Sequence, residues 1–292
     1  MARINRAIEL LTEGKPIFYT GVTELGFESG RNHAGTWADY LCIDLEHLPF
    51  DMTALSGFMQ GLIAGGPTKS GHRSPAVLVT LPTDGTSESM VRTNSWMIKQ
   101  ALATGVHGLM LCHVESPDAV RAFVESARYA QAPAPSGDHG LGQGRRGSGG
   151  QEHASAVWGM STGEYLDRAD VWPLNPDGEL MLGLKLEDRH ALHHAESCID
   201  VPGIALGEWG PGDMGMSFGL KEAHDPPYPP EMQAARLKVK NACDKADVAF
   251  LDIVTPENVR DQIDDGVRIG AATEEAAAIG RRHSGREEEG FV

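Results

Sequence analysis

The stretch LMLGLKLEDRHALHHAESCIDVPGIALGEWGPGDMG, residues 180–215, decides the fold. Its first apolar run, residues 180–187, is typical of a buried strand, and a helical stretch follows over residues 188–200. A second apolar run covers residues 203–209 and ends in a Gly-Pro-Gly turn. Strand, helix and strand in this order form the repeating unit of parallel α/β folds.

The same alternation continues through most of the chain. Strand-like runs occupy residues 16–22, 40–46, 75–82, 108–114, 180–187, 203–209 and 248–254, with an eighth over 264–272. Helical stretches, several opening with Ser, Asp or Pro, cover residues 87–105, 116–130, 188–200 and 229–246. Eight β-then-α units favour an α/β fold of the (β/α)8 TIM barrel type over an open sheet. No GxGxxG follows the first strand, which argues against a dinucleotide-binding fold.

We expect one barrel domain over residues 1–280 and a flexible, charged tail over residues 281–292. A Gly-rich and Pro-rich insertion at about residues 132–159 lacks a hydrophobic period and interrupts the pattern. Two interpretations stay open for this insertion. It is either a flexible surface loop or a lid whose Arg145, Arg146 or His139 meets the substrate.

Composition excludes several classes of function. The net charge of −16 over 292 residues argues against nucleic acid and anionic membranes as partners. The 4 cysteines are far apart and show no CxxC spacing, so we interpret them as reduced core residues. The start of the chain lacks the apolar core of a secretory signal, and no apolar run reaches the ~18 residues of a membrane span. We therefore expect a cytoplasmic protein.

Ionisable residues follow the strand-like runs at the points where a barrel gathers its chemistry. Asp44, Glu46 and His47 follow one run, Glu187 ends another, and Asp213 follows the Gly-Pro-Gly turn. Two carboxylates from separate strands suit a hard divalent cation that also keeps waters and substrate oxygens. The glycines at 210 and 212 would let backbone N–H groups approach an anionic substrate where a helix begins. Taken alone, a strand-end Asp is more typical of a helix cap than of a ligand.

Three segments in this order carry a family resemblance: AGTWADYLCIDLEHLPFD (34–51), GVHGLMLCHVESPDAVRAFVESARY (105–129) and the stretch from 182 to 219. They resemble the HpcH/HpaI family of metal-dependent class II pyruvate aldolases, in the superfamily of citrate lyase beta chains and malyl-CoA lyases. The resemblance extends from about Gly14 to about Ala272. It implies a barrel of the phosphoenolpyruvate/pyruvate-domain type, exchange of the C-terminal helix between subunits, and a homotrimer or homohexamer.

The resemblance also implies roles for individual residues. Glu187 and Asp213 match the two metal-binding carboxylates of the family. His47 matches the histidine that acts as acid and base through a metal-bound water, and Asp44 matches its orienting partner. The backbone at Gly212 and Asp213 matches the segment that holds the pyruvate carboxylate. The expected cofactor is Mg²⁺ or Mn²⁺, although relatives also accept Co²⁺ and Zn²⁺.

Two positions depart from the family pattern. Thr80 stands where the family has an arginine that holds the enolate oxygen, and Lys185 stands where it has glutamine. We hypothesise that Lys185 supplies the missing cation; alternatively, it points outward from the barrel. Trp209 would either form a wall of the substrate pocket or only pack at a strand end, and Glu46 has no catalytic counterpart in the family.

The expected activity is cleavage of a 4-hydroxy-2-oxo acid into pyruvate, or a related 2-oxo acid, and an aldehyde. Two alternatives stay open: decarboxylation or macrophomate-synthase-like bond formation from the same enolate, and a barrel without catalysis. The expected partners are thus a small 2-oxo acid and an aldehyde. We expect His193 and His194 on a helix surface, while His113 either reaches the barrel mouth or packs at its rim.

Overall fold

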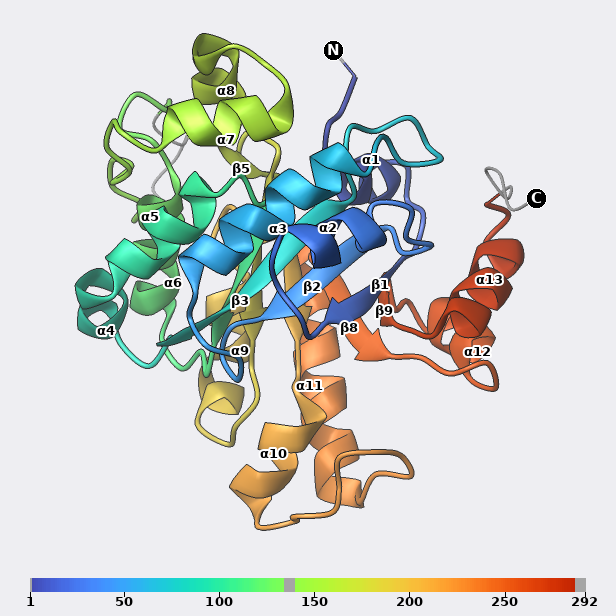
Figure 1. Cartoon of the computed structure of the whole chain (residues 1–292). Coiled ribbons are helices and arrows are strands. Elements are labelled where there is room, and N and C mark those ends of the chain that lie inside the picture. The colour runs from blue at the N-terminus through green and yellow to red at the C-terminus, as the bar shows by residue number, and fades with distance from the viewer. Residues whose placement is uncertain (1, 134–139, 287–292) are drawn as a thin grey trace.

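The computed structural model describes residues 2–133 and 140–286, and its parallel strands form a closed barrel surrounded by helices (Figure 1). The strands lie in the order β4-β3-β2-β1-β9-β8-β7-β6, and pairing of β4 with β6 closes the ring. A short additional strand, β5, pairs only with β6. The predicted (β/α)8 barrel is therefore confirmed. The strands are β1 Ile17–Val22, β2 Tyr40–Asp44, β3 Ala76–Asp84, β4 Gly108–Cys112, β5 Val171–Trp172, β6 Leu180–Lys185, β7 Leu206–Glu208, β8 Ala249–Ile253 and β9 Ile269–Ala271.

The helices follow the strands along the chain and pack around them. The expected helix over 87–105 is two helices, because the backbone leaves helical geometry at Asn94 (φ −95°, ψ 8°), which ends α4 and precedes α5. Among the described helices, none is long and apolar enough to cross a bilayer. The helices are α1 Arg6–Thr12, α2 Phe27–His33, α3 Met52–Ala64, α4 Glu88–Thr93, α5 Ser95–Ala103, α6 Pro117–Ala127, α7 Gln151–Trp158, α8 Thr162–Arg168, α9 Ala191–Ile199, α10 Pro211–Phe218, α11 Pro230–Ala246, α12 Val259–Asp264 and α13 Glu274–His283.

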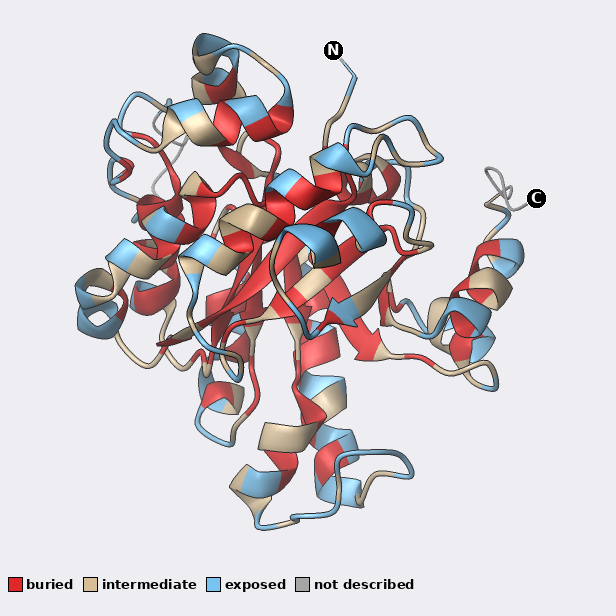
Figure 2. Cartoon of the chain, viewed as in Figure 1, coloured by how far each residue is buried: buried red, intermediate tan, exposed pale blue. Residues whose placement is uncertain are grey.

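Two apolar layers hold the barrel together. The outer layer lies between strands and helices, whose buried faces turn toward the sheet (Figure 2). The inner layer fills the barrel, where Met110 and Met181 share one cluster with Ile8 and Leu11 of α1. Helix α1 thus closes the amino-terminal end of the barrel, so the polar side chains of the strands gather at the other end.

The described part of the insertion, residues 132–133 and 140–159, lies at the amino-terminal end of the barrel, opposite the expected site. Its second half forms α7, whose Trp158 donates to the carbonyl of Gly105 (2.8 Å) and stacks on His107 (ring centroids 5.6 Å apart). Both of these residues precede β4. The lid interpretation is therefore wrong for the described part of the insertion. The reason is topological: the insertion follows α6, which runs back to the end where the strands begin.

The arginines of the insertion accordingly lie away from the strand ends. The backbone N–H of Arg145 donates to the carbonyl of Glu125 in α6 (2.7 Å), and its side chain is exposed. Arg146 is buried, with its guanidinium 4.1 Å from the ring centroid of Tyr129. The prediction that Arg145 binds substrate is therefore wrong for this subunit, and His139 lies outside the described residues.

The C-terminal helix packs against its own barrel in this single chain, and its exchange between subunits stays a prediction. A β-carbon at Gly280 would lie 2.4 Å from the ring of Phe18 in β1, so α13 contacts this strand closely. Beyond α13, the Arg286 guanidinium donates to both oxygens of the buried Asp39 (2.6 and 2.8 Å), and Arg281 lies 3.3 Å from it. Burial opposes the charge of Asp39, but these two arginines lower its pKa. The expected tail is thus ordered at least to residue 286.

Candidate active site

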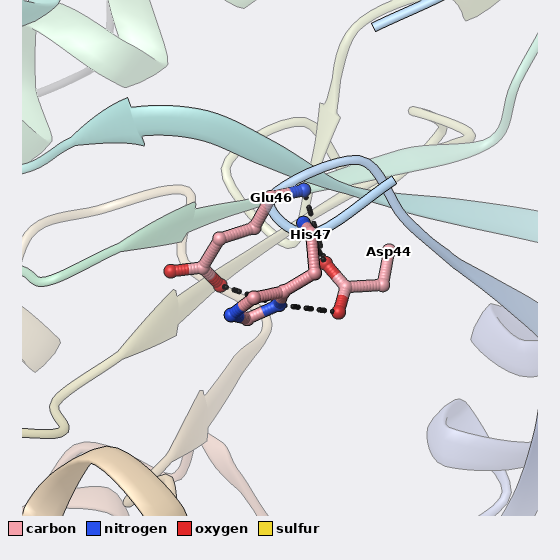
Figure 3. A group of neighbouring side chains, drawn as sticks. All are labelled: Asp44, Glu46 and His47. Atoms are coloured by element: carbon pink, nitrogen blue, oxygen red, sulfur yellow. Dashed lines mark hydrogen bonds and ion pairs between the residues drawn. The ribbon is translucent and has the colours of Figure 1, made fainter. Parts of the chain in front are cut away.

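The carboxyl ends of β2, β4, β6 and β7 bring ionisable side chains together. Because neighbouring parallel strands end at the same side of a barrel, residues far apart in sequence meet there. Figure 3 shows three of them: Asp44 at the end of β2, and Glu46 and His47 on the turn that follows. The full group comprises Asp44, Glu46, His47, Cys112, His113, Lys185, Glu187, Asp188 and Glu208.

His47 and Asp44 form a hydrogen-bonded pair at the rim (Figure 3). His47 Nδ1 lies 2.8 Å from Asp44 Oδ2, and the other Asp44 oxygen accepts the backbone N–H of Glu46 (3.0 Å). The His47 side chain is 64% exposed. The hydrogen bond to Asp44 raises the pKa of His47, so the ring is a stronger base than an isolated histidine. With Nδ1 bonded to the carboxylate, Nε2 is the atom that can exchange a proton.

Glu46 accepts contacts from three other residues. Lys185 Nζ lies 2.7 Å from its Oε2, the thiol of Cys112 donates to the same oxygen (3.1 Å), and His113 Nε2 lies 3.3 Å from Oε1. Although burial opposes the charge, the hydrogen bonds from His113 and Lys185 lower the pKa of Glu46 to about 2. Sequence reasoning found no catalytic counterpart for this residue in the family and left it only a supporting role as an acceptor.

Lys185 points into the barrel, between two carboxylates. Its Nζ lies 2.7 Å from Glu46 Oε2 and 2.8 Å from Glu187 Oε2, and its side chain is 12% exposed. Burial disfavours the ammonium, but the charges of Glu187 and Glu208 outweigh it and raise the pKa of Lys185. The outward orientation left open by the sequence is therefore wrong, and a fixed positive charge stands beside Glu187.

Glu187 is fully buried, and its two oxygens have different partners. Oε1 accepts the backbone N–H of His113 (3.0 Å), whereas Oε2 lies beside Lys185 Nζ but accepts no well-aligned hydrogen bond. Burial raises the pKa of Glu187 despite the lysine. A β-carbon at Gly210 would lie 2.5 Å from Glu187 Oε2, and Gly210 has φ +49°, so this approach requires glycine.

The arrangement fits a hard divalent cation. Ligand atoms of Glu46, Cys112 and Glu187 all lie within 4.8 Å of one another. Burial strongly raises the pKa of Cys112, so its thiol is a poor ligand and the carboxylate oxygens are the suitable donors. Asp213 lies in the first turn of α10, three residues after Gly210, but is not part of this group. Joint metal binding by Glu187 and Asp213 stays a prediction.

Two predicted substrate-binding residues are buried. Thr80 pairs in register with Asp44 and lies 3.8 Å from Cys42 Sγ, and its contact with substrate stays a prediction. Trp209 is fully buried, and its indole N–H donates to Asp252 (3.0 Å). The prediction that Trp209 forms a pocket wall is wrong, because successive strand residues face opposite sides and Trp209 packs in the outer layer.

Several residues at this end were missed or left open by sequence reasoning. Glu208 of β7 stands beside Lys185 in register, and burial raises its pKa to about 7; strand alternation was the signal that could have found it. His224 lies in the loop after α10, where no sequence signal marked it, and a β-carbon at Gly212 would lie 3.0 Å from its ring. His113 reaches the mouth, whereas His193 and His194 are exposed on α9, as predicted.

Comparison with known proteins gives consistent matches. A model of the HpcH/HpaI aldolase/citrate lyase family matches residues 75–278. The hydroxypyruvate/pyruvate aldolase of Roseobacter denitrificans is 24% identical over 283 residues, which cover 95% of this chain and 94% of that protein. An HpcH/HpaI aldolase/citrate lyase family protein from Burkholderia cenocepacia J2315 superposes with a TM-score of 0.71 at 20% identity, covering 97% and 98% of the two chains. Macrophomate synthase superposes with a TM-score of 0.67 at 20% identity, covering 97% and 87%. The structural matches show a shared barrel fold.

Proposed function

The chain belongs to the HpcH/HpaI aldolase/citrate lyase family, and we propose that it is a metal-dependent carbon–carbon lyase. Its substrate would be a 4-hydroxy-2-oxo acid, cleaved to pyruvate, or a related 2-oxo acid, and an aldehyde. The carrying observation is that the Asp44–His47 pair and the Lys185–Glu187 pair meet at one rim, both in contact with Glu46. Retro-aldol cleavage needs a base for the hydroxyl proton and positive charge beside the developing enolate. The first pair would supply the base, His47, and the second would supply the positive charge, Lys185.

His47 would handle the proton in this proposal. Its Nε2 would accept the proton of the 4-hydroxyl group as the carbon–carbon bond breaks. Asp44, bonded to Nδ1 at 2.8 Å, would keep the ring in one orientation and stabilise the resulting imidazolium. The exposure of the ring would then let the proton pass to solvent.

Glu187 and Asp213 would hold the cation, and the first turn of α10 would hold the substrate carboxylate. A bound Mg²⁺ or Mn²⁺, with Co²⁺ and Zn²⁺ as alternatives, would supply Lewis-acid stabilisation of the enolate. The backbone N–H groups at Gly212 and Asp213 would donate to the carboxylate at the positive end of the helix. Lys185 would add a second positive charge, in place of the arginine that Thr80 replaces.

The test is pyruvate release from a panel of 4-hydroxy-2-oxo acids, followed with lactate dehydrogenase, with and without a metal chelator. We expect release that the chelator abolishes, and a loss of about 100-fold or more in Glu187→Gln, because its charge binds the cation. Glu196→Gln is the control, since Glu196 is 65% exposed on α9. Release that survives both the chelator and Glu187→Gln would contradict the proposal. An unchanged rate in Lys185→Gln would remove the compensating role of the lysine alone.

A second candidate activity uses the same enolate and is favoured by the departure of this site from the family pattern. Thr80 stands in place of the family arginine, and Lys185 would supply the positive charge instead. Such an enolate could arise by decarboxylation of oxaloacetate or proceed to unusual bond formation. Pyruvate with an aldehyde, compared with oxaloacetate alone, separates the two activities. We also propose a homotrimer or homohexamer, on the strength of the family resemblance, and light scattering would test the assembly.

A further inference from the structure

We propose that His113 is a positioning residue for this site, acting through both its backbone and its ring. Its backbone N–H would fix the orientation of Glu187, and its imidazole would fix Glu46. The inference rests on the proposed function, because it assigns His113 a part in organising the same site.

The backbone of His113 has a conformation that L-residues avoid. Its φ is +45°, and Asp247 is the one other non-glycine residue with positive φ in the described ranges. Asp247 ends helix α11, a common place for a left-handed residue. His113 instead follows β4 directly, so its conformation is not explained by a helix end. Unfavourable conformations of this kind persist where the surroundings enforce them, often at functional sites.

The left-handed turn places two groups of His113 at the mouth. The backbone N–H donates to Glu187 Oε1 at 3.0 Å. In an extended continuation of β4, position 113 would face away from the interior, because Cys112 faces inward to Glu46. The turn therefore brings the N–H of His113 to Glu187 and its ring to Glu46, with Glu187 also near the ring.

The imidazole contacts acidic residues from two strand ends. Nε2 lies 3.3 Å from Glu46 Oε1, while Nδ1 lies 3.8 Å from Glu187 Oε1 and 3.9 Å from Asp188 Oδ2. The other oxygen of Glu46 is bonded to Lys185 at 2.7 Å. Removing the ring would free one side of Glu46, and Lys185 would lose part of the support that holds it beside Glu187. The ring is 33% exposed, so its role is not that of a core side chain.

Glycine and alanine at position 113 separate the two contributions. Both His113→Gly and His113→Ala remove the imidazole, but glycine adopts positive φ freely whereas alanine does not. If the left-handed N–H orients Glu187, His113→Ala should bind Mn²⁺ about 5-fold or more weakly than His113→Gly, measured by electron paramagnetic resonance without substrate. Thermal melts of both variants report whether each one folds. His193→Asn, on the exposed face of α9, is the matched control.

The contribution of the ring is tested by exchange of the pyruvate methyl protons in deuterated water with Mg²⁺. We expect His113→Gly to lower kcat for exchange about 10-fold, the size of one charge-assisted hydrogen bond, with KM nearly unchanged. Free imidazole should restore much of this rate in His113→Gly. Mg²⁺ is the metal for this assay because it prefers oxygen ligands, so the added imidazole should leave it in place. An equal concentration of sodium chloride controls for ionic strength.

Each result decides one part of the proposal. Equal Mn²⁺ affinity of the glycine and alanine variants would overturn the backbone role. A wild-type rate in His113→Gly, or a slow rate that imidazole does not raise, would overturn the role of the ring. A wild-type protein that binds Mn²⁺ but exchanges no pyruvate protons would contradict the proposed function instead, while the comparison of affinities would still test the backbone role.

Discussion

Replacing Lys185 with methionine tests the electrostatic reading of the site most directly. Methionine keeps much of the side-chain volume but leaves Glu46 and Glu187 facing one another without the ammonium that lies 2.7 and 2.8 Å from them. Removing one partner of a buried ion pair commonly costs about 3–5 kcal/mol in the free energy of unfolding. For 292 residues, with roughly 2.1 cal/mol/K of unfolding entropy per residue, this corresponds to a fall in Tm of about 5–8 °C.

The assay is thermal unfolding of Lys185→Met and wild type in chelator and again with Mg²⁺. Because the variant keeps both carboxylates but loses the ammonium between them, a bound cation should raise its Tm more than that of the wild type. Lys245→Met is the control, since the Lys245–Glu196 pair is 71% and 65% exposed and screened by solvent, so its loss should leave Tm nearly unchanged. A variant that melts with the wild type in chelator, or gains no more from Mg²⁺, would refute the reasoning.

Three further outcomes follow from contacts of single residues. Asp44→Asn should lower the pKa of His47, because the hydrogen bond that the ring donates to Asp44 is what raises it. NMR titration of the ring would show this, and the acid limb of kcat/KM should move to lower pH. Trp209→Phe should lower the free energy of unfolding by about 1–3 kcal/mol, because Asp252 loses a buried donor, while KM stays unchanged; a raised KM would place the indole in the pocket after all. Arg145→Ala should leave KM for every substrate unchanged in steady-state assays, and a clear increase would mean that the insertion reaches a site.

Much of the barrel and part of the site could be predicted from the sequence. Buried parallel strands appear as short apolar runs, and each expected run contains one strand of the ring. Asp44 and His47 are three residues apart, so their pairing is local. The inward orientation of Lys185 could also have been predicted. Residues 185 and 187 lie on the same face of a strand, and Glu187 was already expected at the mouth of the barrel.

Other features depend on tertiary structure that no local pattern encodes. The turn at His113 exists because Glu187, 74 positions later in the chain, accepts its N–H. The contacts of Glu46 likewise come from β4 and β6. The lid alternative for the insertion failed for a different reason: the glycines suggested a mobile segment, whereas the position between α6 and the next barrel strand already implied the end opposite the site.

The link between Arg286 and Asp39 has a practical consequence for handling the protein. Asp39 also accepts the backbone N–H of Phe18 at 2.8 Å, so the last described arginine is joined through one carboxylate to the first barrel strand. Proteolytic nicking or a stop codon just before this arginine would leave α13 in place but deprive Asp39 of its strongest partner. Purification tags therefore belong beyond residue 286, and batches should be checked by mass spectrometry for an intact terminus before their stabilities are compared.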